Sequence, residues 1–83
     1  MFTVYVLKSS ATDKYYIGQT ADIGKRLLYH NSGYSKSTKA CLPWKLVYPE
    51  SFITRALAMK RETEIKKYKS RFMIEKLLGK YLD

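Results

Sequence analysis

The stretch YYIGQT at residues 15–20 decides the fold, because its first four residues form the second strand of a predicted β-hairpin. Tyrosine and isoleucine are enriched in strands. Residues 2–7 read FTVYVL and are also aromatic and β-branched, and a polar segment separates the two runs. Two such runs joined by a short polar segment predict an antiparallel hairpin with strands at 2–7 and 15–18.

A helix is predicted directly after the hairpin. Asp22 is a favourable N-cap residue, and Ile23, Arg26 and His30 then recur at intervals of three or four. Gly33 lies just beyond this run, where helices commonly end. Residues four apart lie on one face of a helix, so the side chains of Arg26 and His30 can reach the same ligand.

The rest of the chain predicts one more strand and two more helices. After a polar, basic loop at 34–43, residues 44–48 read as a strand that ends at Pro49, at a sheet edge or a bend. Thr54 can cap a helix to about Tyr68, and Ser70 can cap a third through Tyr81. The order β-β-α-β-α-α predicts an α+β fold in which helices flank a three-stranded antiparallel sheet, and we expect residues 1–83 to form a single domain.

Composition narrows the class of protein. A single cysteine and a single histidine among 83 residues exclude an internal disulfide and a zinc site built from those residue types. No signal peptide or membrane-spanning run is evident, so we expect a cytoplasmic protein without a membrane partner. Sixteen Lys and Arg against seven Asp and Glu give a net charge of +9, which favours a polyanionic partner such as nucleic acid.

Glu62 is the acidic residue whose position calls for an explanation. It shares one helical stripe with Ala58 and Ile65, whereas Glu64 points elsewhere. A carboxylate beside apolar neighbours needs a cation to compensate for lost hydration. The two explanations are an ion pair, with Lys66 one turn on or another basic residue, and a bound metal ion.

One reaction uses all of these groups together, namely hydrolysis of a phosphodiester. It requires a carboxylate that holds a divalent cation, a base that prepares a water molecule, and a guanidinium that stabilises charge on the phosphoryl oxygens. Glu62, Tyr5, Tyr16, His30 and Arg26 are the side chains that could meet these needs.

The same residues carry a resemblance to a known family. The segments VYV at 4–6, YIG at 16–18, RLLYH at 26–30 and KRETEIK at 60–66 resemble the ordered motifs of the GIY-YIG nuclease superfamily. The chain is most similar to the short stand-alone bacterial proteins described as excinuclease-subunit-C-like, through HNSG at 30–33 and the lysine- and threonine-containing loop before Pro43. The resemblance covers nearly the whole chain.

The resemblance implies a role for each candidate residue. Tyr5 and Tyr16 match the motif tyrosines that line the site, and Arg26 matches the catalytic arginine. His30 occupies a position held by histidine or tyrosine, and Glu62 matches the single metal-binding glutamate, which would hold Mg²⁺ or Mn²⁺. Either Tyr16 or His30 could be the proton acceptor.

A basic surface would bind the substrate. We expect DNA, with RNA as the alternative, to contact cations on both sides of the site, although a solvated surface would carry similar charges. The candidates are Lys36, Lys39, Lys45, Lys60, Arg61, Lys66 and Lys67.

These observations predict a metal-dependent endonuclease that hydrolyses DNA, with structure selectivity and a repair role as expectations. Many nuclease members carry an asparagine in the third helix where this chain has Met73, Ile74 and Glu75. That difference motivates the alternative of a nucleic-acid-binding module with weak or no catalysis. The apolar character of the same helix also suggests a homodimer or a partner protein bound through it.

Overall fold

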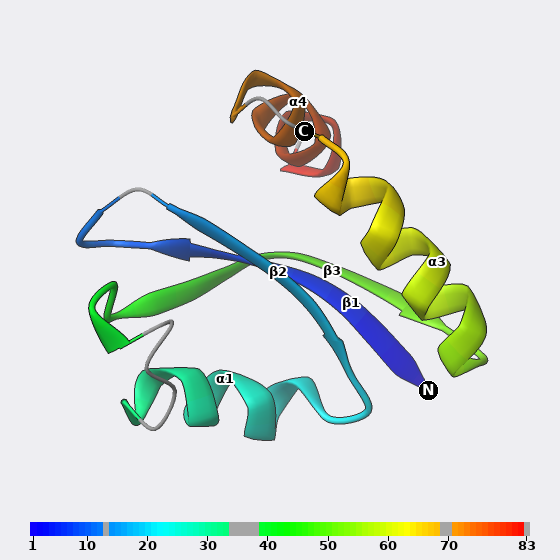
Figure 1. The fold of residues 1–83 in the computed structure, drawn as a ribbon, viewed down its shortest axis with the longest axis horizontal. Helices are drawn as coiled ribbons and strands as arrows, with labels where there is room; N and C mark the ends of the chain where they lie inside the picture. Colours follow the sequence, from blue (N-terminus) through cyan, green and yellow to red (C-terminus); the bar gives the residue numbers. More distant parts are fainter. Residues whose placement is uncertain (13, 34–38, 69–70, 83) are drawn as a thin grey trace.

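A three-stranded antiparallel sheet with helices on both faces forms the molecule (Figure 1). The computed structural model describes residues 1–12, 14–33, 39–68 and 71–82. The elements confirm the predicted α+β class and order. They are β1 (Phe2–Ser9), β2 (Tyr15–Thr20), α1 (Ile23–Asn31), β3 (Trp44–Phe52), α3 (Arg55–Lys66) and α4 (Arg71–Leu82).

The first strand is the centre of the sheet, whose strand order is β2-β1-β3. Both neighbours pair with β1 in antiparallel fashion, and Tyr5 lies opposite Gly18 on one side and Pro49 on the other. Residues Val4–Leu7 of β1 are at most 1% exposed. The predicted hairpin is therefore confirmed, and its first strand runs through the middle of the molecule.

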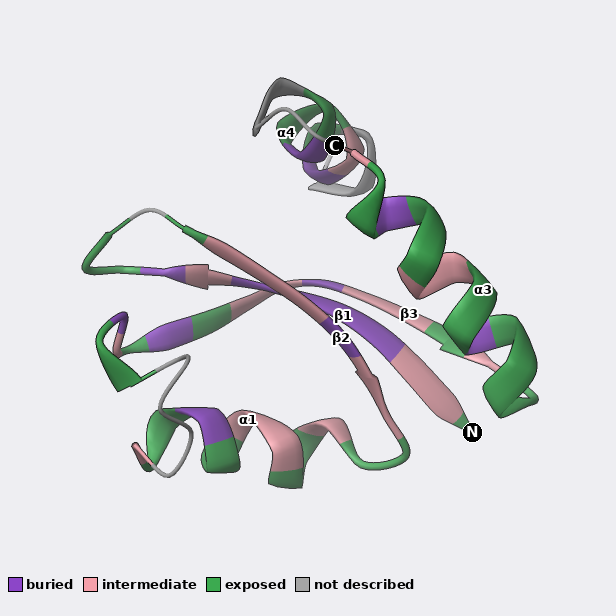
Figure 2. Cartoon of the chain, in the orientation of Figure 1, coloured by how far each residue is buried: buried purple, intermediate pink, exposed green. Residues whose placement is uncertain are grey.

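Successive side chains of β1 point to opposite faces of the sheet, so the core has two layers, one on each face. Helix α1 covers one face, and α3 and α4 cover the other (Figures 1 and 2). The buried residues on the α1 face are Tyr5, Leu7, Cys41 and Trp44. Those on the opposite face are Val4, Val6, Tyr48, Ala58, Ile65, Ile74 and Leu78.

The predicted N-caps of the first two helices and the predicted glycine after the first helix are confirmed. The Asp22 carboxylate accepts a hydrogen bond from the backbone N–H of Lys25 at 3.1 Å, and the Thr54 hydroxyl accepts one from Leu57 N–H at 3.2 Å. Gly33, just past α1, has φ +82°, a conformation that residues with a Cβ rarely adopt. Ser70, the expected cap of the third helix, lies outside the described residues.

Several element boundaries differ from the prediction. The third strand does not end before Pro49 but continues to Phe52. Proline is accepted here because β3 is an edge strand and needs no N–H on its unpaired side. The two hairpin strands are each two residues longer than expected, and α3 ends at Lys66 instead of Tyr68.

Asn31 fixes α1 to the sheet through a contact that the sequence did not indicate. Its amide nitrogen donates to the carbonyl oxygen of Trp44 at 3.0 Å, and its amide oxygen accepts from the Trp44 N–H at 2.6 Å. This pair joins the last residue of α1 to the first residue of β3. It thereby positions the helix that carries Arg26 and His30.

None of the helices in the described ranges is long and apolar enough to cross a membrane.

Candidate active site

Three aromatic side chains from three elements meet on the α1 face of the sheet. The Tyr5 hydroxyl of β1 and the Nε2 atom of His30 on α1 are 3.1 Å apart and hydrogen-bonded. The Tyr16 ring of β2 lies with its centroid 4.6 Å from that of His30 and 6.4 Å from that of Tyr5. Both Tyr5 and His30 are only 1% exposed. The predicted Tyr5, Tyr16 and His30 therefore form one cluster.

Gly18 makes room for this cluster. It lies opposite Tyr5 across the hairpin, and the Tyr5 ring extends over it. A Cβ atom added at Gly18 would lie 2.7 Å from the Tyr5 hydroxyl oxygen and 2.9 Å from Tyr5 Cζ. The glycine is therefore required by the close approach of a side chain to the backbone, which is the reason expected for a glycine in a strand.

We expect Gly18→Ala to destabilise the protein by about 1–3 kcal/mol, because the added methyl group overpacks the Tyr5 ring, which is buried and hydrogen-bonded to His30. Chemical denaturation would measure the change. Gly24→Ala is the matched control. A Cβ atom added at Gly24 would have Asp22 Oδ1 as its nearest neighbour, 3.6 Å away, and alanine in a helix is more stable than glycine by up to about 1 kcal/mol. A Gly18→Ala protein as stable as the parent would contradict this account of the site.

Arg26 joins the cluster through Tyr5. Its guanidinium is hydrogen-bonded to the Tyr5 hydroxyl, and this bond raises the pKa of Arg26. Burial raises the pKa of Tyr5, while the hydrogen bond with Arg26 acts in the opposite direction. Arginine can only donate, so the Tyr5 oxygen accepts from Arg26 and its proton is available to Nε2 of a neutral His30. A continuous polar chain thus runs from Arg26 on α1 through Tyr5 on β1 to His30, which is again on α1.

His30 is held in its neutral form. Burial lowers its pKa, and the positive charge of Arg26 lowers it further. A neutral imidazole retains one nitrogen that can accept a proton. The buried cluster therefore contains a proton acceptor at neutral pH.

This environment makes stability depend on pH in a predictable direction. The unfolded chain takes up a proton at His30 near the ordinary pKa of about 6.5, whereas the folded protein resists it. The free energy of unfolding should therefore fall as the pH drops below about 6.5. We expect a smaller fall between about pH 7.5 and about pH 5 in His30→Gln, measured by denaturation at both values. Equal falls in the two proteins would show that His30 is not the group responsible.

Glu62 approaches the site from α3, on the other side of the sheet from α1. Its side chain is 19% exposed, and its Oε2 atom forms an ion pair with Lys66 Nζ. Its negative charge is the smallest of the contributions that raise the pKa of Tyr5. One of the two predicted explanations, the ion pair with Lys66, is confirmed.

A divalent cation at Glu62 fits the donor set that the structure describes. Within residues 1–12, 14–33, 39–68 and 71–82, no three His, Cys, Asp or Glu side chains form a group able to hold a metal ion. Mg²⁺ does not need such a group, because it keeps several waters and uses one or two carboxylates together with substrate phosphate. Glu62, a partly exposed carboxylate, meets that requirement.

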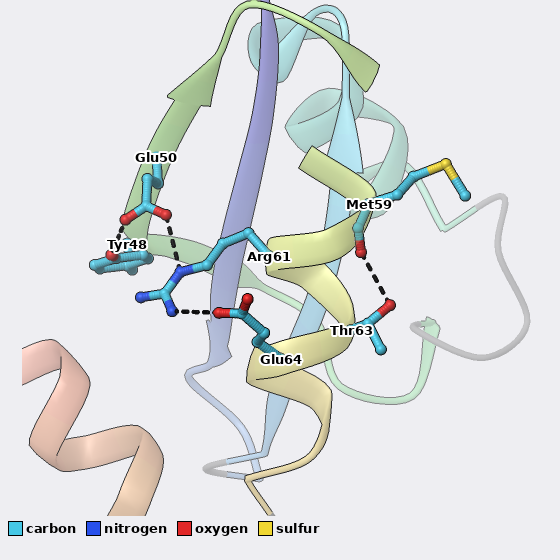
Figure 3. A network of polar contacts seen from close by, with 6 residues as sticks. All are labelled: Tyr48, Glu50, Met59, Arg61, Thr63 and Glu64. Atoms are coloured by element: carbon cyan, nitrogen blue, oxygen red, sulfur yellow. Dashed lines mark hydrogen bonds and ion pairs between the residues drawn. The ribbon is translucent and has the colours of Figure 1, made fainter. Parts of the chain in front are cut away.

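A second polar network, which sequence reasoning missed, holds α3 against β3 (Figure 3). The Glu50 carboxylate accepts hydrogen bonds from the Tyr48 hydroxyl at 2.6 Å and from Arg61 Nε at 2.9 Å, and Arg61 also binds Glu64 at 3.2 Å. Arg61 and Glu62 are consecutive on α3. The contact between Arg61 on α3 and Glu50 on β3 therefore fixes the rotation of α3 that determines where Glu62 points. No local signal links Glu50 to Arg61, eleven residues away.

The cations predicted to bind nucleic acid differ in their surroundings. Arg61 and Lys66 are engaged in ion pairs with carboxylates of the chain itself. Lys36 lies outside the described residues. The other four are exposed to solvent: Lys39, Lys45, Lys60 and Lys67.

Comparison with known proteins gives a consistent result. The model of the GIY-YIG catalytic domain matches residues 1–76. A UPF0213 protein of Streptococcus pneumoniae serotype 4 is 43% identical over 67 residues, which are 80% of this chain and 67% of that protein. A UPF0213 protein of Staphylococcus saprophyticus is 42% identical over 66 residues, which are 78% of this chain and 79% of that one.

A solved structure supports the same relationship. The solution NMR structure of a UPF0213 protein from Bacillus halodurans is similar, with a TM-score of 0.61 and 33% sequence identity. The alignment covers 95% of this chain and 84% of that one. The resemblance predicted from the motifs is therefore confirmed, and so is the fold.

Proposed function

Because this chain belongs to the GIY-YIG family, we propose that it is a metal-dependent endonuclease that hydrolyses phosphodiester bonds of DNA. The observation that carries the proposal is the buried Tyr5–His30 pair, which is linked to the partly exposed Arg26, is packed against Tyr16 and is subject to the charge of Glu62. It combines a permanent cation, a hydroxyl and a neutral imidazole. Hydrolysis of a phosphodiester uses each of these three groups.

The proposed reaction begins with proton transfer through Tyr5. A water molecule beside Tyr5 gives a proton to the Tyr5 oxygen as the Tyr5 proton passes to Nε2 of His30. The water oxygen forms a bond to phosphorus, and the bond from phosphorus to the leaving oxygen breaks. That oxygen then takes a proton from solvent. Arg26 donates hydrogen bonds to the phosphoryl oxygens, where negative charge grows.

Tyr16 has a supporting role in this proposal. Its ring packs against His30, and its ring centroid lies 6.2 Å from that of Trp44. Tyr16 therefore limits the movement of the imidazole. The alternative, in which Tyr16 itself accepts the proton, predicts that Tyr16→Phe abolishes cleavage as fully as His30→Ala. Our assignment predicts that Tyr16→Phe retains more activity.

Glu62 would hold the divalent cation, Mg²⁺ or Mn²⁺. When bound, such an ion neutralises charge on the phosphate and on the leaving oxygen. Lys66 already supplies a positive charge beside the Glu62 carboxylate, so the ion pair would have to open or shift as the cation binds.

A direct test compares labelled single-stranded, duplex, flap and branched DNA with Mg²⁺, with Mn²⁺ and with EDTA. We expect cleavage of at least one substrate in the presence of metal, its loss in EDTA and its return when metal is restored. The activity must also elute with the protein in size-exclusion chromatography. The substrate that is cut would test the further proposals of structure selectivity and a repair role, and an RNA arm would test the alternative substrate.

A second candidate function is binding of nucleic acid without turnover. It is favoured by the Glu62–Lys66 ion pair and by Ile74, a buried core residue in the third helix, where many nuclease members carry an asparagine. Salt-sensitive DNA binding without metal-dependent cleavage of any substrate would favour this candidate and overturn the first.

A further inference from the structure

The surface of α1 carries a groove whose use the proposed catalysis leaves unexplained. This α1 groove has a volume of about 560 Å³ and runs from the end of β2 along one side of the helix. Its lining includes Asp22, Lys25, Arg26, Leu28 and Tyr29. Its volume lies within the range of roughly 300–1,000 Å³ that small-ligand sites occupy.

Arg26 belongs to both the α1 groove and the buried cluster. Its guanidinium is hydrogen-bonded to Tyr5, and its central carbon lies 4.8 Å from the centroid of the Tyr29 ring. One side chain therefore connects the proposed phosphate position with the groove. A strand whose phosphate is held by Arg26 would have a neighbouring nucleotide at the groove.

The groove combines apolar surface with positive charge. Leu28 is 73% exposed and Tyr29 is 38% exposed, beside the cations Lys25 and Arg26. The carboxylate of Asp22 already accepts a hydrogen bond from the backbone N–H of Lys25, as the cap of α1. An aromatic ring flanked by cations suits a nucleobase with its phosphate, since bases stack on aromatic rings and arginine adds a cation–π contribution.

We propose that the α1 groove binds one unpaired nucleotide of the substrate strand, next to the phosphate held by Arg26, with its base stacked on Tyr29 and its phosphate near Lys25. A base within a duplex has both faces covered by its neighbours, so only an extruded or single-stranded base can enter. The inference deepens the proposed function and rests on it for the position of the scissile phosphate. It predicts a preference for single strands, flaps or bulges.

The test measures binding in EDTA, so that it needs no cleavage. The probe is a short single-stranded oligonucleotide carrying one 2-aminopurine, moved stepwise along the strand. We expect fluorescence quenching at one position, binding weakened roughly 5- to 100-fold in Tyr29→Ala, and nearly unchanged binding in Tyr29→Phe. Ile53→Ala removes an exposed apolar side chain outside the groove and serves as the control.

An abasic site at the quenched position gives an independent readout with unaltered protein. The abasic site should lower the affinity of the parent protein to the affinity that Tyr29→Ala shows for the intact strand. It should cause no further loss of affinity in Tyr29→Ala. Equal binding by Tyr29→Ala and the parent, or the same abasic penalty in both, would overturn the proposal. So would a change of oligomeric mass in Tyr29→Ala without a change in DNA binding, since a second copy would then occupy the groove.

The two proposals can fail separately. Cleavage by the parent, with binding and cleavage unchanged in Tyr29→Ala, would refute the nucleotide site and leave the nuclease intact. Strong Tyr29-dependent binding without cleavage of any substrate would refute the nuclease and leave the nucleotide site intact.

Discussion

Glu62→Ala should reduce metal-dependent DNA cleavage by roughly 10³-fold or more, because it removes the carboxylate that would hold the cation. Binding of DNA should persist or tighten, since the variant is more positive by one charge and Lys66 loses its carboxylate partner. Catalysis should therefore fall without a loss of binding. A merely destabilised protein would lose both.

Glu64→Ala is the matched control for this variant. Both substitutions remove one negative charge from α3, and both break an ion pair with a cation on the same helix. Glu64 is 48% exposed and binds Arg61 (Figure 3). We expect Glu64→Ala to cut DNA at close to the parent rate, measured under single-turnover conditions. Equal activity of Glu62→Ala and the parent would refute the assignment of Glu62.

The fold was predictable because its signals are local. Caps at Asp22 and Thr54, the positive-φ glycine after α1 and the strand-forming residues on either side of the hairpin turn each act within a few residues. Pro49 misled the prediction for the opposite reason. Pro49 was expected to mark a sheet edge or a bend, and only the assembled sheet shows that β3 is an edge strand that continues past the proline to Phe52.

The site was predictable to the extent that motifs carry it. Tyr5, Tyr16, Arg26 and His30 were expected to act together, and the hairpin register and α1 bring them together. The supporting contacts were not predictable. Asn31 binds a backbone thirteen residues away, and its role depends on how the loop between α1 and β3 returns to the sheet.

Charge alone also gave an incomplete picture of the surface. Arg61 was predicted to contact nucleic acid, and in the structure it is bound by Glu50 and Glu64. The sequence around a lysine or arginine does not show whether its charge pairs with a carboxylate of the same chain or stays available to a ligand. Which of the two applies depends on acidic partners such as Glu50, which are close in space and distant along the chain. The role of Arg61 toward nucleic acid remains a prediction.

Arg26→Ala should reduce the cleavage rate roughly 10²- to 10³-fold, the usual cost of removing one donor to a developing negative charge. Arg26→Lys should recover only part of that loss, because an ammonium group keeps the charge and lacks the planar pair of donors that fits a phosphate. Single-turnover cleavage at saturating protein would separate this effect from weaker binding.

The single histidine of the chain provides a second readout for Arg26 that does not depend on activity. The charge of Arg26 contributes to the lowered pKa of His30, after burial. Arg26→Ala should therefore raise that pKa toward its ordinary value, whereas Arg26→Lys, which keeps the charge, should change it less; NMR titration of the imidazole would measure both. Loss of cleavage with an unshifted His30 pKa in Arg26→Ala would mean that Arg26 acts on the substrate without being coupled to the Tyr5–His30 pair. The continuous polar chain from Arg26 through Tyr5 to His30 would then be refuted.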